Sequence, residues 1–186
     1  WFSFCWNGNL ANYTELKQHL MEKADYHLVY DNSDTEILMH YISRELKGSV
    51  KPNLVKVFSR LAQKLDGCFN IAFINAFGEM IILRDPYGFR PVVYGWRDDM
   101  FLAASESNAL INCGVTEYKH LEPGHLIYIK NGHIEIKKYA ENPRRAHCMF
   151  ECVYFANVSS VLDGQSVYIT RTNLGKELAQ QETEKI

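Results

Sequence analysis

The sequence lacks the motifs that mark several large enzyme classes. It contains no G-x-G-x-x-G, P-loop, G-x-S-x-G or H-E-x-x-H pattern. Dinucleotide enzymes, P-loop nucleotide hydrolases, α/β-hydrolases and zincin proteases are therefore not indicated. Its five cysteines include no C-x-x-C pair, which argues against a zinc ribbon or a thioredoxin-like site. We expect reduced, mostly buried thiols in a reducing compartment.

An excess of charge and a long apolar run are also missing. Twenty Lys and Arg against 22 Asp and Glu give a net charge of -2, so no basic field would attract nucleic acid or an anionic membrane. No apolar stretch approaches the roughly 18 residues of a membrane-spanning helix, and no secretory signal is visible. Because 47% of the 186 residues are apolar, a buried core can form. We expect a soluble, cytoplasmic protein.

Both ends of the sequence are abrupt. Trp1–Trp6 starts as an apolar, strand-like run without Met or a polar lead-in, and Leu174–Lys185 is typical of a helix that stops without a capping residue. Chain termini are usually exposed and loosely held. We therefore expect that parts of the protein are missing at both ends.

Three helical patterns occupy the first third of the chain. Residues 12–24 place Leu16 and Leu20 on one face. Ser33-Asp34-Thr35-Glu36 predicts a capping box, in which the Ser33 hydroxyl meets the Glu36 N–H and the Glu36 side chain reaches back. The third pattern, residues 52–65, has Pro52 just inside its start.

The pattern then changes to short β-rich runs. Three hairpins are expected, pairing residues 68–75 with 79–84, 91–95 with 100–104, and 125–130 with 133–138. Ser105-Glu106-Ser107 is expected to cap a short helix that runs to Asn112. Helices followed by antiparallel hairpins favour an α+β fold over a doubly wound sheet. The pattern becomes irregular near residue 143, which predicts a boundary between residues 1–142 and 143–186.

Asn7-Gly8-Asn9 follows the opening strand. The Asn7 side-chain amide and the Gly8 backbone N–H can both donate to one developing oxyanion, and removing one such donor typically costs roughly 3–4 kcal/mol of barrier. Glycine suits a close approach of the backbone to a substrate, or a positive φ. Asn-Gly is also the commonest turn dipeptide, so an ordinary turn is the alternative interpretation.

Asp34 occupies the first turn of an expected helix, where the helix dipole favours a carboxylate. That is a sufficient structural explanation. The functional alternative is that Asp34 faces a pocket and pairs with a substrate ammonium group, and the residue types do not choose between the two.

The segment Arg84–Pro91 is interpreted as architecture. Asp85, Pro86 and Gly88 fall at positions preferred in a type I turn. Arg84 and Arg90 are expected to make buried ion pairs or contacts with backbone carbonyls. The seven histidines show no ligand-like spacing.

In order along the chain, these segments resemble the glutaminase domain of the class II (N-terminal nucleophile) glutamine amidotransferases. The matching blocks are Trp6–Leu10, Ser33–Glu36, Leu65–Gly67, Arg84–Pro91, Ala104–Ser107 and Glu122–Gly124. Cys148–Ala156, Ser160–Gly164 and Ser166–Tyr168 resemble the linker that, in one branch of this family, leads into a phosphoribosyltransferase domain. The resemblance implies a four-layer αββα sandwich with antiparallel sheets, truncated at its N-terminus. Residues 1–142 would be the glutaminase domain, and residues 143–186 the linker and the start of the next domain.

The resemblance also implies a reaction. An N-terminal cysteine thiolate would attack the glutamine amide, the free α-amino group would act as base, and water would release glutamate. The ammonia would travel inside the protein to phosphoribosyl pyrophosphate, giving 5-phosphoribosylamine and pyrophosphate in the first step of purine synthesis. Asn7 and Gly8 match the oxyanion-hole pair, and Asp34 matches the acid that holds the glutamine α-ammonium. Mg²⁺ at residues outside this chain and homo-oligomerisation are further implications.

The chain departs from the family pattern in several places. The nucleophile, and an Arg that grips the glutamine carboxylate, should precede Asn7 by many tens of residues, but only six residues do. Cys5 is rejected as a substitute, because nucleophile and oxyanion donors must converge on one carbonyl from opposite sides. Trp6 stands where relatives commonly have His. Cys148 falls where some members place one ligand of an iron–sulfur cluster, which needs about four thiolates.

Two alternatives to this assignment remain. Another class II amidotransferase, such as a hexosephosphate aminotransferase, would share the Asn7 and Asp34 blocks, although the segment from Cys148 to Tyr168 argues against it. An amidotransferase-like scaffold without a nucleophile would also account for the missing cysteine, but it would have no catalytic use for Asn7, Gly8 and Asp34.

Overall fold

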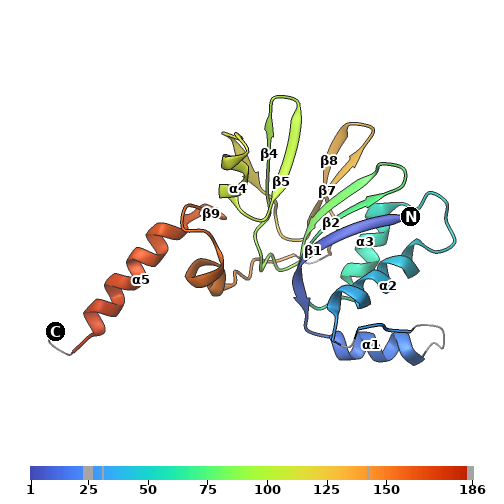
Figure 1. The fold of residues 1–186 in the computed structure, drawn as a ribbon, viewed down its shortest axis with the longest axis horizontal. Helices are drawn as coiled ribbons and strands as arrows, with labels where there is room; N and C mark the ends of the chain where they lie inside the picture. The colour runs from blue at the N-terminus through green and yellow to red at the C-terminus, as the bar shows by residue number, and fades with distance from the viewer. Residues whose placement is uncertain (23–26, 31, 142, 184–186) are drawn as a thin grey trace. The chain divides into compact units, whose positions relative to one another are not determined.

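The structure is a computed structural model that describes residues 1–22, 27–30, 32–141 and 143–183. It divides into two compact units, each made of two chain segments. The first unit comprises Trp1–Phe89 and Glu122–Arg145, and the second comprises Arg90–Leu121 and Ala146–Ile186. Each unit contains helices and an antiparallel sheet (Figure 1). The predicted α+β class is confirmed.

The first unit is built on a five-stranded antiparallel sheet. Its strands, in spatial order, are β1 (Phe2–Leu10), β2 (Gly67–Asn75), β3 (Met80–Arg84), β7 (His125–Lys130) and β8 (His133–Lys138). The expected hairpins β2–β3 and β7–β8 are confirmed. Strand β1 lies at one edge and pairs with β2 along its whole length, which places Asn7 opposite Asn70 and Gly8 opposite Phe69.

Three helices cover one face of this sheet: α1 (Tyr13–Glu22), α2 (Asp34–Leu46) and α3 (Leu54–Ala62), which lie on the same side of it in Figure 1. They share one hydrophobic core with the sheet, formed in part by Leu16, Leu20, Ile37, Ile42, Phe58, Phe69, Phe73 and Ile81. The predicted amphipathic stripes are therefore the surfaces that form the core. Burial of this apolar area is the main force holding helices and sheet together.

The first and third helices differ in their boundaries from the expectation, and the third ends at Ala62 and not at residue 65. The first helix begins at Tyr13, and the expected end at residues 23–24 lies outside the described residues. The third helix begins at Leu54, because the Asn53 side chain accepts a hydrogen bond from the Lys56 N–H at 3.1 Å and acts as the N-cap. Pro52 therefore precedes the cap instead of occupying the first turn.

The second unit contains a three-stranded sheet in the order β5 (Met100–Ala104), β4 (Val93–Arg97) and β6 (Tyr118–His120), with helix α4 (Ser107–Asn112). The hairpin of β4 and β5 is confirmed, although its first strand begins at Val93 and not at residue 91. Val93, Leu110 and Val115 form a small core between the sheet and α4. Strand β6 was not predicted.

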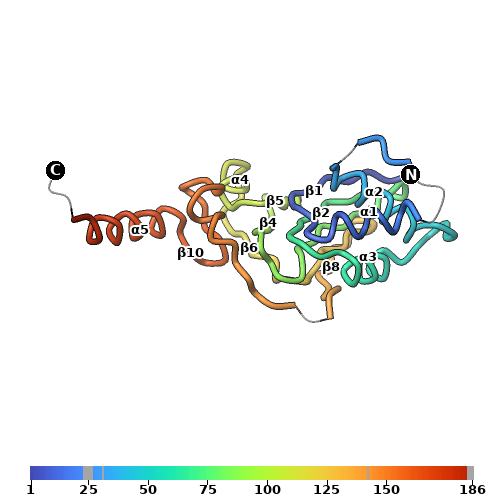
Figure 2. The backbone as a smooth tube through the Cα atoms, turned by 90° about the horizontal axis from the view of Figure 1, so that it is seen from below, coloured from blue at the N-terminus to red at the C-terminus, as the bar shows by residue number. Residues whose placement is uncertain are grey.

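The C-terminal part of the second unit holds a short π-helix (Glu151–Phe155), the two-residue strands β9 (Val161–Leu162) and β10 (Gln165–Ser166), and helix α5 (Val167–Gln181). Figure 2 shows α5 following β10 without a break. The helix begins at Val167, before the expected Leu174, because the Ser166 hydroxyl caps it by accepting from the Ile169 N–H. The expected end, Lys185, lies outside the described residues. No described helix is long and apolar enough to span a membrane.

Candidate functional site

Asn7 and Gly8 lie within strand β1, so the interpretation as an ordinary turn is wrong. Gly8 has no positive φ. A Cβ built on it would lie 2.2 Å from the Cys68 carbonyl oxygen and 2.7 Å from the Phe69 Cα. Close approach of the β1 and β2 backbones therefore explains the glycine, and the predicted close approach to a substrate stays a prediction.

The side chains of β1 alternate between the two faces of the sheet. Phe2, Phe4 and Trp6 pack against the core beneath the helices, whereas Cys5 and Asn7 are exposed on the opposite face. The Asn7 amide is thus available on the face that no described helix of this unit covers. Cys5 shares this face and strand with Asn7, about 7 Å away along the chain.

The Gly8 backbone N–H points away from β2. Phe69 lies opposite Gly8 in β2. Its N–H donates to the Asp85 carboxylate and its C=O accepts from the Asp85 N–H, so Gly8 and Phe69 exchange no hydrogen bonds with each other. Two residues further along β1, the Leu10 N–H points to the same open edge and donates to Asp34 Oδ2 at 2.9 Å. Alternate N–H groups of a strand point the same way, so the Gly8 donor and Asp34 share one edge of the sheet.

Asp34 is the first residue of α2 and is half-buried. The helix start is fixed by Ser33, whose hydroxyl accepts from the Glu36 N–H at 3.4 Å, as expected for the first half of a capping box. The Leu10 bond uses one carboxylate oxygen of Asp34. Within the part of the chain that the structure describes, Oδ1 has no hydrogen-bond partner, so it can accept from a ligand.

The second half of the predicted capping box is wrong. The Glu36 carboxylate accepts from the backbone N–H groups of Val29 at 2.6 Å and Tyr30 at 2.9 Å. Both bonds lower the pKa of Glu36, and the bond from Val29 has the larger effect. The side chain therefore holds residues 29–30 beside the start of α2, a non-local role that the spacing of a capping box does not reveal.

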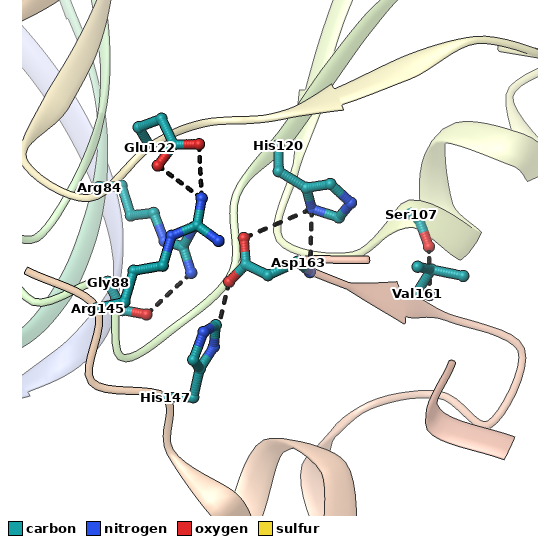
Figure 3. Close-up of polar contacts among 9 residues, drawn as sticks. All are labelled: Arg84, Gly88, Ser107, His120, Glu122, Arg145, His147, Val161 and Asp163. Carbon is teal, nitrogen blue, oxygen red and sulfur yellow. Dashed lines mark hydrogen bonds and ion pairs between the residues drawn. The ribbon is translucent and has the colours of Figure 1, made fainter. Parts of the chain in front are cut away.

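The segment Arg84–Gly88 forms the expected turn. The Gly88 N–H donates to the Asp85 carbonyl at 3.1 Å, and the Tyr87 N–H donates to the Asp85 carboxylate at 2.8 Å. Arg84, which is 1% exposed, donates to the Gly88 carbonyl at 2.9 Å (Figure 3). In the second unit, Arg90 pairs with Glu151 at 3.1 Å. Both predicted roles of these arginines, carbonyl contact and ion pair, are confirmed.

The cysteines differ from expectation, because none of the five is buried. Cys5 and Cys113 are exposed, and Cys68, Cys148 and Cys152 are half-buried. Among the described residues, no group of three or more His, Cys, Asp and Glu side chains is arranged to hold a metal ion. An iron–sulfur cluster needs about four thiolates, and the described residues supply Cys148 without the other ligands beside it.

Sequence reasoning missed a polar cluster in the second unit. The Asp163 side chain, 3% exposed, lies with its carboxylate 3.3 Å from His147 Nδ1 and 3.9 Å from His120 Nδ1 (Figure 3). The Asp163 backbone N–H also contacts His120 at 3.3 Å. The cluster therefore joins three residues of this unit that lie far apart in the sequence. Only the turn dipeptide Asp163-Gly164 was visible in the sequence, since the histidines lie far apart along the chain.

Several known proteins are similar to this chain. A family model described as a glutamine amidotransferase domain matches residues 2–112. The chain is 34% identical over 173 residues to an amidophosphoribosyltransferase of Methanothermobacter thermautotrophicus, covering 92% of this chain and 35% of that protein. It is 35% identical over 186 residues to the Escherichia coli amidophosphoribosyltransferase, covering 94% of this chain and 36% of that protein. The chain thus spans about a third of the length of these curated relatives.

A solved structure shows the same fold. The glutamine phosphoribosylpyrophosphate amidotransferase of B. subtilis, complexed with ADP and GMP, matches with a TM-score of 0.84 at 33% identity. The match covers 99% of this chain and 39% of that one. The fold expected from the resemblance is thereby confirmed.

Proposed function

Because the chain belongs to the glutamine amidotransferase domain family, we propose that it is the glutaminase part of an amidophosphoribosyltransferase. The complete protein would hydrolyse glutamine and transfer the ammonia to phosphoribosyl pyrophosphate, forming 5-phosphoribosylamine, glutamate and pyrophosphate. The relatives named above support this choice of enzyme. The observation that carries the proposal is the common sheet edge of Gly8 and Asp34, with Asn7 on the adjoining open face.

Asn7 and Gly8 would stabilise the oxyanion. When a thiolate attacks the glutamine amide carbon, the carbonyl oxygen gains negative charge, and the Asn7 side-chain amide and Gly8 N–H can donate to it. Both donors are held by the β1–β2 pairing before the reaction begins. Donors fixed in this way lower the barrier because they need not reorganise as charge develops.

Asp34 would hold the other end of the substrate. Its carboxylate lies at Leu10, two residues and about 7 Å along the strand from Gly8. This separation is comparable to the reach of an extended glutamine from its α-nitrogen to its amide group. Oδ1, which has no partner among the described residues, can accept a charge-assisted hydrogen bond from the α-ammonium, so the site would fix both ends of glutamine.

The nucleophile in this proposal is an N-terminal cysteine outside this chain. The α-amino group would take the proton of the thiol, and the sulfur would bond to the amide carbon. The α-amino group would then pass that proton to the leaving nitrogen, which departs as ammonia, and water would cleave the thioester to glutamate. Mg²⁺ would contribute only to the phosphoribosyl step, on residues outside this chain. Iron–sulfur ligation by Cys148 stays a prediction.

Membership of this family also suggests how the domains are arranged along the chain. We assign residues 1–142 to the glutaminase domain and 143–186 to the linker and the start of the phosphoribosyltransferase domain; residue 142 itself lies outside the described residues. A cytoplasmic location and a homo-oligomer are part of the proposal. The balanced charge supports a protein without nucleic-acid or membrane partners.

The test uses the full-length gene product. Formation of 5-phosphoribosylamine should proceed with glutamine and, independently, with ammonia, and the mature chain should begin with Cys. Amination of a sugar phosphate would instead support a hexosephosphate aminotransferase. A mature chain with no Cys ahead of the β1 strand would support the scaffold alternative.

A further inference from the structure

Two hydrogen bonds join strand β1 to the first turn of helix α2. The Leu10 backbone N–H donates to Asp34 Oδ2 at 2.9 Å, and the Trp6 indole Nε1–H donates to Thr35 Oγ1, also at 2.9 Å. Thr35 and Asp34 are adjacent on the helix, whereas Trp6 and Leu10 are four residues apart on the strand. The helix start is therefore attached to the strand at two separated points.

The second attachment lies next to both proposed substrate-contacting groups. Trp6 immediately precedes Asn7, and Thr35 immediately follows Asp34. Core packing by Ile37 and Ile42 fixes the body of α2 on the sheet. The bond at Leu10 holds the first turn of the helix at one point, and the bond between Trp6 and Thr35 adds a second point that sets the local orientation of this turn.

Trp6 itself does not face the substrate. Its ring is half-buried on the helix side of the sheet and packs against the core, whereas Asn7 is exposed on the opposite face. Any effect of Trp6 on glutamine must therefore act through the elements that it connects.

We propose that Trp6 and Thr35 are a positioning pair, which sets the place of the Asp34 carboxylate relative to the Asn7-Gly8 oxyanion donors. This inference rests on the proposed function. The pair governs how well glutamine is held, while the steps that use free ammonia do not depend on it. Removing the Trp6 donor or the Thr35 acceptor should weaken glutamine binding to the same extent, because either change breaks the same hydrogen bond.

The test compares variants of the full-length enzyme. Trp6→Phe keeps an aromatic ring in the core but removes the N–H donor, and Thr35→Val keeps the side-chain shape but removes the acceptor. Each should raise the glutamine KM by about three- to tenfold, the range expected for loss of one ordinary hydrogen bond. Glutamine kcat should change less than about twofold, and ammonia-dependent synthesis should be unchanged.

Matched variants sharpen the comparison. Thr35→Ser retains the hydroxyl and should keep the wild-type KM. The double variant Trp6→Phe/Thr35→Val should be no worse than either single variant, because both changes remove the same bond. Trp96→Phe changes an exposed tryptophan of the second unit and should have no effect on the glutamine KM.

Three outcomes would contradict the proposed positioning role. The first is an unchanged glutamine KM in Trp6→Phe and Thr35→Val, and the second is an additive effect in the double variant. The third is an equal loss of glutamine- and ammonia-dependent activity, which would indicate a role in folding. The companion variant Asp34→Asn separates the two proposals. If Asp34→Asn raises KM and the pair variants do not, the positioning pair is wrong and the proposed function stands; if Asp34→Asn also leaves KM unchanged, the proposed role of Asp34 is wrong as well.

Discussion

The Leu10 backbone N–H donates to the Asp34 carboxylate at 2.9 Å, although the two residues are 24 positions apart. This bond fastens the start of α2 to the open edge of the five-stranded sheet. Because the Gly8 N–H points to the same edge, the two ends of the proposed glutamine site come from one strand and one helix that are directly bonded.

Replacing Asn7 by Ala should remove one of the two oxyanion donors. Glutamine-dependent turnover of the full-length enzyme should fall by about 10²–10³, while ammonia-dependent synthesis survives. Asn9→Ala is the matched control, since Asn9 is exposed on the same face of β1, and it should change little. Equal loss of both activities in Asn7→Ala would point to a folding defect.

Asp34→Asn removes the charge but keeps an oxygen that can accept from the Leu10 N–H. Hydrogen bonds to charged groups contribute about 1.5–3 kcal/mol, so the glutamine KM should rise by roughly 10- to 100-fold with a much smaller change in kcat. Asp34→Ala should weaken glutamine binding at least as much, because it also breaks the bond to β1. Steady-state kinetics at varied glutamine would detect this, and wild-type KM values would remove Asp34 from the site.

Gly8→Ala should destabilise the first unit, because its Cβ would lie 2.2 Å from the Cys68 carbonyl oxygen. Forcing an extra methyl group into a closely packed position typically costs about 1–3 kcal/mol. The measurement is denaturant unfolding. Gly175→Ala is the control: that glycine lies in α5, and a Cβ added to it would have nothing within 4 Å, so alanine should be neutral or stabilising by about 0.5–1 kcal/mol. Similar stabilities for the two variants would contradict the close approach of β1 and β2.

Asp85 should give a pH dependence of stability. Burial raises the pKa of Asp85 despite its hydrogen bonds from the Tyr87, Gly88, Phe69 and Phe89 N–H groups. An acid whose pKa is higher in the folded than in the unfolded protein favours folding most when protonated. Its contribution is therefore greatest below its unfolded pKa of about 3.9 and is lost as the pH rises through the folded value.

The comparison that isolates this effect is wild type against Asp85→Asn, which does not titrate. The unfolding free energy of the wild type minus that of the variant should fall as the pH rises from acid toward neutral. Unfolding curves at several pH values would measure it. A difference that grows with pH would mean that the backbone N–H groups outweigh burial and that the pKa of Asp85 is lowered.

Local signals predicted local structure well. The stripe of Leu16 and Leu20, the cap at Ser33 and the turn begun by Asp85 depend on residues close in sequence, and the structure confirms all three. Predictions failed where a distant partner intervened. Glu36 has the spacing of a capping box, but its carboxylate is taken by the Val29 and Tyr30 N–H groups.

Burial was likewise hard to predict for particular residues. Cysteine is commonly buried, yet Cys5 falls on the exposed face of an edge strand, where period-2 alternation places it with Asn7. In the second unit, His120, His147 and Asp163 meet although they are far apart in the chain. No spacing rule connects residues that meet only after folding.

The sequence by itself determined the central part of each α-helix and the three predicted hairpins, but neither strand β6 nor the π-helix. Through its ordered blocks it indicated the family and the residues Asn7, Gly8 and Asp34. The periodicities of 3.6 and 2 and the caps and turns act within a few residues, so they can be recognised along the chain. Only the tertiary structure decided that the Gly8 N–H faces an open edge, that Asp34 is bonded to that edge, and that Trp6 reaches Thr35. These relationships follow from strand register and from helix packing on the sheet, which depend on contacts between distant segments.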